Sequence, residues 1–479
     1  MFYIICLLGI FFLYFFYFYW SYFNNTIGGP IPLPFIGNIF FFCENEKNTN
    51  KIKLLLYHHK SFGPIWETFL PTKSIFKLER GVHISLPIDL KCVLKDSFNN
   101  FEKGKIQYEI FYDLLGDGIF NSDGEKWKNQ RKIASHKFSR NNLKLYMLDI
   151  FCKHADNLIN NIENIEQNRF FDIQHLFFKY TFDAICEIGM GIDSSTLDKK
   201  FNSFGKSFDI IQELIEKRFF NPLWKIQNRL KIGDEKYFNK NIKNINNFIY
   251  NIIEKRKKET INLENKKDIL SLFMLNESNN FKLKDVITNF LIAGRDTTAT
   301  ALTWAIYALC KDENQEILLN LREEIFKIIK FEKPTFKKIQ SMSYLYGFIS
   351  EILRLYAPVP IDTKICVKDT QLPSGIHINK DDRIFYSPLL MGHIDAFWDQ
   401  PEKIKPERWI ENRNISQYIF PVFNAGYRLC LGKEMAYLEI SVVLIYLLRN
   451  FDFCLLSDNI EQITKITLNV KNGLFVSAY

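Results

Sequence analysis

The sequence contains no closely spaced pair of cysteines. It has nine, an odd number, scattered through 479 residues and never spaced as Cys-x-x-Cys. Disulfide frameworks need an even number of cysteines, and zinc sites use closely spaced pairs. The pattern therefore argues against a disulfide-stabilised scaffold and favours a reducing compartment.

Strong charge and internal repeats are missing as well. The net charge of +8 is a small excess for 479 residues and does not by itself indicate nucleic-acid binding. A basic face for an acidic protein partner or an anionic membrane would account for it. The sequence shows no repeat of fixed period. It is instead 47% hydrophobic and 16% aromatic, enough for a large buried core, and its length would allow two or three domains.

Charged side chains are absent from residues 1–23. A helix of that length spans about 30 Å of hydrocarbon, so the segment is predicted to be an N-terminal transmembrane anchor. Tyr19 and Trp20 fit the aromatic belt at a membrane interface. A cleavable signal peptide would show a basic start and small residues before the cut, and neither is present. The first basic residue is Lys47, so charge alone gives no orientation.

A proline-rich segment, residues 24–38, follows the predicted anchor. Pro30, Pro32 and Pro34 alternate with apolar residues. Alternating prolines cannot continue a helix and favour a stiff extended chain. We therefore expect a hinge here, and one globular domain over residues 39–479.

Hydrophobic periodicity predicts the elements of that domain. Short alternating stretches within 75–95 are consistent with a small sheet, and the turn at Gly375 is predicted to lie in a hairpin. Apolar residues at three- and four-residue spacing predict helices through most of 140–255 and one long helix at 281–311. After Glu434 we expect an amphipathic helix and then short strands.

The ten residues FNAGYRLCLG carry the clearest chemistry, with Phe423, Gly426, Arg428, Cys430 and Gly432 at the informative positions. A cysteine set between glycines, with an arginine two residues before it, suits an axial thiolate ligand to haem iron. The glycines let the backbone pass close to a flat macrocycle. Arg428 can pair with a haem propionate, and Phe423 can shield the sulfur from water. The alternative is a structural cysteine in a turn.

With this motif the sequence resembles the cytochrome P450 family of haem-thiolate monooxygenases. The resemblance extends from the N-terminal segment to the C-terminus. It implies a mainly α fold with small β-sheets (α+β), a haem-thiolate catalytic domain over 39–479, and haem b held by Cys430 as the axial ligand.

A tryptophan and an arginine upstream fit the same family. Trp127 and Arg131 are four residues apart on a predicted helix, 125–138, and so share a face. In the family such a pair donates to a haem propionate, whereas alone it would be read as a surface cation–π contact. Lys126 and Lys128 belong to a solvated basic face. The resemblance implies that part of this face receives an electron-donating flavoprotein.

A second motif, AGRDTT at 293–298, lies in the long predicted helix. Glycine and threonine are poor helix-interior residues, so a local loosening of the helix is plausible. The resemblance implies that Asp296 and Thr297 deliver protons during oxygen activation, as general acid catalysis requires. The alternative is that both side chains bond to nearby backbone.

Glu351 and Arg354 are spaced for an ion pair on one helical face. In the family this Glu-x-x-Arg pair forms a buried triad with a downstream arginine, which by position is Arg408. Such a triad is structural, because removing one partner strands a buried charge. Lys364 occupies a position where the family often has a basic residue facing the second propionate.

Within the family, IAGRDTTATALTW and LRLYAPVPIDTK are most similar to the fatty-acid and alkane ω-hydroxylases. Tyr427 stands where that branch usually has proline, which affects the stiffness of the loop. Ala293 stands where some animal ω-hydroxylases carry a glutamate that bonds covalently to haem, so we expect the haem to be non-covalent.

The resemblance implies insertion of one oxygen atom from O2 into a C–H bond of a lipophilic substrate, with electrons from NADPH through NADPH-cytochrome P450 reductase. A long-chain fatty acid is the favoured substrate, and a sterol or other small molecule is the alternative. Candidate pocket residues, placed by resemblance, are Phe290, Leu291, Val359, Pro360 and Ile361. The implied location is the endoplasmic reticulum membrane, with the catalytic domain in the cytosol.

Two other classes stay open. A haem-thiolate isomerase or dehydratase would rearrange lipid peroxides without a reductase, and a haem carrier or sensor would not turn over. Neither needs a proton supply, so the presence of Asp296 with Thr297 favours the monooxygenase.

Overall fold

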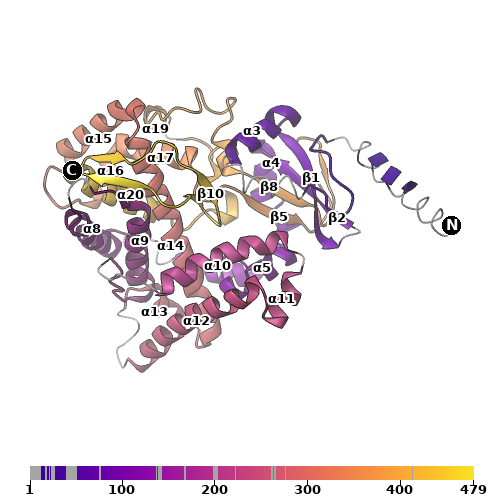
Figure 1. Ribbon diagram of the computed structural model, residues 1–479, viewed down its shortest axis with the longest axis horizontal. Helices are drawn as coiled ribbons and strands as arrows, with labels where there is room; N and C mark the ends of the chain where they lie inside the picture. The colour runs from indigo at the N-terminus through magenta and orange to yellow at the C-terminus, as the bar shows by residue number, and fades with distance from the viewer. Residues whose placement is uncertain are drawn as a thin grey trace. The chain divides into compact units, whose positions relative to one another are not determined.

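The computed structural model describes residues 12–13, 15–16, 19–20, 22, 27–38, 51–74, 77–135, 138, 143–166, 169–197, 203–221, 223–259, 263, 266–275, 277–412 and 414–479. The chain forms two compact units. The first unit combines residues 1–102 with 361–390, and the second unit combines residues 103–360 with 391–479. The predicted fold class is confirmed, since the chain is mainly helical with small sheets (Figure 1).

The first unit is built on a mixed sheet whose strand order is β1-β2-β8-β5-β3. Strands β1 and β2 form an antiparallel pair, β2 and β8 run parallel, and β5 pairs antiparallel with both β8 and β3. A separate hairpin joins β6 and β7, as predicted around Gly375. The elements are α3 (Lys51–Phe62), β1 (Ile65–Ser74), β2 (Lys77–Ile84), α4 (Pro87–Lys91), η1 (Cys92–Asp96), η2 (Phe98–Asn100), β3 (Phe101–Glu102), β5 (Asp362–Cys366), β6 (Thr370–Gln371), β7 (His377–Ile378) and β8 (Arg383–Tyr386).

The sheet predicted within 75–95 is only partly correct. Strand β2 ends at Ile84, and the next residues form the helical turns α4 and η1. Pro87 takes one of the first helical positions, where its missing N–H costs nothing. Leu90 and Val93 are fully buried at helical spacing. A short apolar run fits both periods, which is why the sequence pattern was ambiguous here.

The described part of the predicted hinge, residues 27–38, lies along β1. The backbone N–H of Asn38 donates to the carbonyl of Phe69 over 2.8 Å, and the Asn38 side chain accepts from the Phe69 N–H at 2.7 Å. The Glu67 N–H donates to the Gly28 carbonyl at 3.0 Å. These bonds attach the proline-rich segment, whose residues 33–37 form a tight turn, to the edge of the sheet.

Much of the predicted anchor, including residues 1–11, lies outside the described residues. Among the residues that are described, none of the helices combines the length and the apolar character that a membrane crossing demands. The boundaries predicted for the anchor, the hinge and the catalytic domain stay predictions.

The second unit is mostly helical, with two small antiparallel sheets, β4-β12-β9 and β10-β11. Its helices are α5 (Lys105–Leu115), α6 (Gly124–Ser135), η3 (Leu143–Met147), α8 (Leu148–Glu163), α9 (Ile173–Met190), α10 (Ser203–Phe220), α11 (Trp224–Leu230), α12 (Asp234–Lys258), α13 (Ile269–Met274), α14 (Asn280–Leu309), η5 (Asp312–Asn314), α15 (Gln315–Ile328), α16 (Phe336–Ser341), α17 (Ser343–Leu355), α19 (Glu407–Glu411), η6 (Pro421–Phe423), η7 (Gly426–Arg428) and α20 (Lys433–Asn450). Its strands are β4 (Phe171–Asp172), β9 (Phe453–Leu455), β10 (Gln462–Thr464), β11 (Leu468–Val470) and β12 (Phe475–Ala478), and α18 (Pro388–Met391) falls at the boundary between the units.

Helix α14 is the centre of the second unit and confirms the long helix predicted at 281–311. It packs against α9, α12, α17 and α20 (Figure 1). The side chain of Asn279 caps its N-terminus by accepting from the Phe281 N–H at 2.9 Å. Near its C-terminus Trp304 is fully buried, and its indole N–H donates to the Leu468 carbonyl at 2.8 Å. Most of the helix is therefore shielded from water.

Helix α20 confirms the helix predicted after Glu434, and strands β9 to β12 follow it as expected. The helix is not amphipathic, however. Residues 442–445 are buried consecutively, at 0% exposure each. Helices α8, α14, α15, α16 and α17 all pack on it, so every face meets protein.

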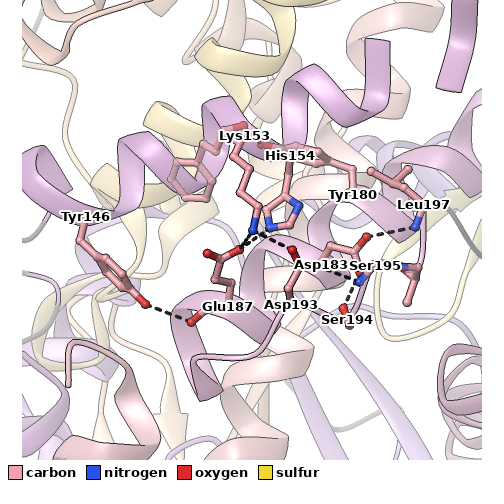
Figure 2. A network of polar contacts seen from close by, with 12 residues as sticks. Tyr146, Lys153, His154, Tyr180, Asp183, Glu187, Asp193, Ser194, Ser195 and Leu197 are labelled. Atoms are coloured by element: carbon pink, nitrogen blue, oxygen red, sulfur yellow. Dashed lines mark hydrogen bonds and ion pairs between the residues drawn. The ribbon is translucent and has the colours of Figure 1, made fainter. Parts of the chain in front are cut away.

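A polar network ties α8 to α9 (Figure 2). From α8, Lys153 and His154 both reach the carboxylate of Glu187, at 2.9 and 2.8 Å. The hydrogen bond from His154 is the main reason that the pKa of Glu187 is lowered. Asp183 accepts from the Leu197 N–H at 3.0 Å and so fixes the turn that follows α9. Because α9 lies along α14, these contacts stabilise the surroundings of the central helix.

Candidate functional site

The cysteine motif forms a closed loop between η6 and α20. The backbone N–H of Cys430 donates to the Phe423 carbonyl at 2.8 Å, which draws the ends of the loop together. Asn424 and Gly426 both have a φ of about 60°, a sign of φ that glycine adopts freely and other residues rarely adopt. The Gly426 position of the motif is therefore required by the turn itself.

Cys430 presents an accessible thiol on this loop. Protein atoms nevertheless crowd around it, and this desolvation raises the pKa of the thiol. The backbone N–H groups of Gly432 and Lys433 and the charge of Arg131 act in the opposite direction. Desolvation thus favours the thiol form of Cys430, whereas the surrounding N–H donors would suit a thiolate. A coordinating metal deprotonates such a thiol.

Two arginines and a tryptophan lie together at the cysteine loop. Trp127 and Arg131 lie on α6, and Arg131 donates to the Leu429 carbonyl at 2.6 Å. The guanidinium groups of Arg131 and Arg428 lie 5.8 and 4.3 Å from the centre of the Trp127 ring. The structure therefore brings Trp127, Arg131, Arg428 and Cys430 together.

The two arginines differ in their counterions. Arg428 forms an ion pair with Asp123 and donates to the Ser122 carbonyl at 3.1 Å. Arg131 is half-buried, and among the described residues no carboxylate forms an ion pair with it. Burial and the neighbouring charge of Arg428 both lower its pKa, although Cys430 opposes this. An anionic group beside Arg131 would offset the free-energy cost of burying its positive charge.

The acid and the alcohol of the second motif lie on α14. Asp296 is buried, at 1% exposure, and burial raises the pKa of its carboxyl to about 6. One oxygen accepts from Gln212 of α10 at 2.9 Å, and the other accepts from Arg295 at 2.9 Å. The Thr297 hydroxyl donates to the Ala293 carbonyl at 2.7 Å, which is the backbone contact weighed as the alternative. The oxygen of this hydroxyl can still accept a hydrogen bond through its lone pairs.

Lys364 belongs to the first unit. It lies on β5 with 2% exposure, and its amine donates to the Asp362 carboxylate at 3.2 Å. The hydroxyl of Tyr386 donates to the same Asp362 oxygen at 2.6 Å.

The predicted triad is present. Glu351 and Arg354 are fully buried and form a bidentate ion pair, with both N–O distances at 2.8 Å. Arg408 reaches Glu351 at 3.4 Å. The indole N–H of Trp409 also donates to Glu351 at 2.9 Å, a contact that the motif did not indicate.

Aromatic rings connect this triad to the cysteine loop. Trp409 lies against Phe420 with ring centres 4.6 Å apart, and Phe420 directly precedes η6. Phe423 of that turn contacts Tyr437 of α20 at 5.5 Å. The buried ion pair therefore supports the loop through packed rings.

Of the residues suggested for a substrate pocket, Phe290 is buried at 8% exposure. Its ring stacks on Phe138 at 5.9 Å and contacts Phe273 at 6.2 Å. Leu291 is buried at 2% exposure. Both have the surroundings of core residues in this structure.

Comparison with known proteins decides the family. The cytochrome P450 family model matches residues 27–474. The chain belongs to the cytochrome P450 family. It is 35% identical over 430 residues to cytochrome P450 704C1 of Pinus taeda, covering 81% of this chain and 83% of that protein. It is 30% identical over 471 residues to cytochrome P450 94B1 of Arabidopsis thaliana, covering 93% and 90%. Cytochrome P450 86B1 of the same plant is 33% identical over 425 residues, covering 82% and 76%.

As a cytochrome P450 this protein is a monooxygenase of the oxidoreductase class, and the family uses a haem-thiolate cofactor. The residues present fit that group. An accessible sulfur with two backbone N–H donors is suited to a metal-bound thiolate. Beside it, Arg131 is a half-buried cation without a carboxylate partner among the described residues, which suits an anionic substituent on the cofactor.

Sequence reasoning missed the residues that hold the predicted ones in place. Gln212 reaches Asp296 across 84 positions of sequence, and Asp123 reaches Arg428 across 305. Neither contact leaves a recognisable pattern in the local sequence. Arg295 stood inside the quoted motif but received no role, although a charged residue within an apolar helix was a signal.

Proposed function

We propose that this cytochrome P450 hydroxylates the terminal, or ω, position of a long-chain fatty acid. Haem b bound through Cys430 would supply activation of O2 and insertion of one oxygen atom into a C–H bond. The protein would provide the thiolate ligand, the side chains that bind the propionates, an environment that excludes water, and a path for protons.

The cysteine loop provides the thiolate ligand, and the loop and α6 together provide the side chains that bind the propionates. Cys430 binds as the thiolate, stabilised by the N–H groups of Gly432 and Lys433, while the Phe423 ring limits access of water to the sulfur. Arg131 and Arg428 pair with propionates, and Trp127 adds an indole N–H donor. These groups fix the cofactor in one orientation without a covalent bond, because Ala293 cannot form an ester.

Lys364 is assigned to the second propionate. Its ammonium group carries three N–H donors and donates to Asp362 and to the Thr363 carbonyl at 3.2 Å each, so a propionate would join or replace these acceptors.

Proton delivery is assigned to Asp296 and Thr297. A general acid works best when its pKa lies near the operating pH, and the carboxyl of Asp296 has a pKa of about 6 because it is buried. We propose that it takes a proton from the solvent side and passes it to the hydroxyl of Thr297. The Thr297 hydroxyl keeps its lone pairs available while it donates to Ala293.

The observation that carries this function is the buried carboxyl with a raised pKa on α14, at the residue directly before Thr297. It favours oxygen activation driven by a reductant over a peroxide isomerase or a haem carrier, which need no protons. The fatty-acid substrate is supported by the similarity of residues 292–304 and 353–364 to ω-hydroxylases. A sterol or another lipophilic molecule is the alternative.

The proposal includes a redox partner and a membrane. NADPH-cytochrome P450 reductase would supply electrons through the basic face around α6, where Lys126 and Lys128 are exposed. Residues 1–23 would anchor the protein in the endoplasmic reticulum membrane, with the catalytic domain in the cytosol.

Two measurements test the proposal. First, the ferric protein is titrated with saturated fatty acids and, in parallel, with sterols, and displacement of water from the haem is followed by absorbance. Second, the best binder is incubated with reductase, NADPH and O2, and the products are identified by mass spectrometry. We expect an ω-hydroxy fatty acid whose formation requires NADPH. A product formed from a lipid peroxide without NADPH would instead show the isomerase.

A further inference from the structure

A buried arginine on α14 is shared by two carboxylates. Nη1 of Arg295 lies 2.8 Å from Asp209 of α10 and 2.9 Å from Asp296 of its own helix. The Arg295 side chain is 5% exposed, and its guanidinium lies over the rings of Phe178 and Phe208 at 4.7 and 5.5 Å. A cation this deep needs a counterion at all times.

The two carboxylates are not equivalent. The Asp296 side chain is 1% exposed, whereas the Asp209 side chain is 51% exposed and reaches water. Water can therefore solvate the carboxylate of Asp209, while desolvation penalises the charge on Asp296. The second oxygen of Asp296 is held by Gln212, one turn along α10 from Asp209.

This sharing changes the cost of protonating Asp296. An arginine next to an acid normally lowers the pKa of that acid, because neutralising the acid strands the cation. Here Arg295 would keep Asp209 as its counterion when Asp296 takes a proton. Burial is the main cause that raises the pKa of Asp296, and the charge of Asp209 acts in the same direction against that of Arg295.

The other charged groups at this position come from α9. His175 is influenced by the charges of Lys179, Asp209 and Arg295, and desolvation is the main reason that its pKa is lowered. Asp172, at the start of α9, acts on His175 as well, so the charges near Arg295 come from α9 and α10.

We propose that Asp209 is a positioning residue for proton delivery, because it holds Arg295 paired and so lets Asp296 exchange its proton. The inference rests on the proposed role of Asp296. It assigns to α10 a function in catalysis that the motif on α14 does not contain.

The test is a pH titration of the ferric holoenzyme followed by difference infrared spectroscopy. The C=O band of protonated Asp296 is identified by its loss in Asp296→Asn. In the unmodified protein we expect its midpoint near pH 6. In Asp209→Asn we expect the midpoint to fall by about one pH unit, because Arg295 then has Asp296 as its remaining carboxylate.

The chain offers a matched control on the same helix. Glu213 is 53% exposed, close to the 51% of Asp209, and it pairs with Lys217 rather than with Arg295. Glu213→Gln removes the same charge and should leave the midpoint where it was. Asp209→Glu keeps the charge and should restore it. Haem content and the melting temperature of each variant show whether the fold is intact.

The outcomes separate this inference from the proposed function. An unchanged or raised midpoint in folded Asp209→Asn, or an Asp296 band that does not titrate, overturns the inference. A shift of equal size in Glu213→Gln also overturns it, since the effect would then be unspecific. If Asp296→Asn turns over with unchanged coupling of NADPH to product, the role of Asp296 fails, whatever the titration shows.

Discussion

Replacing Glu351 by alanine should destabilise the protein far more than removing a surface carboxylate. Glu351 is fully buried and accepts from Nε and Nη2 of Arg354 and from the Trp409 indole, at 2.8, 2.8 and 2.9 Å. Without it Arg354 is a fully buried cation that retains carbonyl contacts and loses its carboxylate. Breaking a buried ion pair in this way costs about 3–5 kcal/mol.

A pair with the same i,i+3 spacing provides the control. Glu125 and Lys128 lie 2.7 Å apart, but their side chains are 78% and 55% exposed. Exposed pairs are worth at most about 1 kcal/mol, so Glu125→Ala should be nearly neutral. The two pairs share their spacing and their acid type, whereas Glu351 is buried and accepts from Trp409 as well as from an arginine.

The measurement is a urea titration of the holoenzyme, recorded both by far-UV circular dichroism and by Soret absorbance. We expect Glu351→Ala to lose Soret absorbance at lower urea than its helical signal, because Trp409 connects the ion pair to Phe420 before the cysteine loop. If Glu351→Ala and Glu125→Ala unfold within about 1 kcal/mol of each other, the reasoning about the buried charge is refuted.

Three further substitutions test other parts of the structure. Cys430→Ala should abolish haem retention or the thiolate signature of the reduced carbonyl complex, and an unchanged spectrum would refute the ligand assignment. Thr297→Ala should release peroxide and lower the yield of product per NADPH by about 100-fold or more, as loss of a proton donor predicts, and undiminished coupling would remove its role. Gly347→Ala should unfold at lower urea, because a Cβ there would lie 2.3 Å from the Pro406 carbonyl oxygen; a midpoint equal to that of the unmodified protein would show that the backbone can adjust.

The parts of the site that sequence predicted are those whose spacing is local. Arg428 and Cys430 share one turn, and Trp127 and Arg131 share one helical face, so each pair could be recognised without a structure. That the two pairs meet was implied only by family resemblance. The structure places Arg131 on the carbonyl of Leu429, directly before the cysteine.

The fold was predictable where periodicity ran long enough. Helix α14 extends from Asn280 to Leu309, close to the expected range, because apolar residues recur over many turns. The structure of the segment after Ile84 was not predictable, since a few apolar residues fit a strand and a helix equally well. The burial of α20 on every face also escaped prediction, because it depends on how many helices pack against it.

Dependence on tertiary packing also explains why the protonation behaviour of Asp296 could not be predicted from its motif. An acid beside an arginine suggests a fixed ion pair with a lowered pKa, yet burial raises the pKa of Asp296 to about 6. What reverses the direction is desolvation by the packed helices, assisted by a carboxylate on α10 that is 86 residues away from Arg295 in sequence. The motif therefore specifies that an acid is present, and tertiary packing decides whether that acid can move a proton near neutral pH.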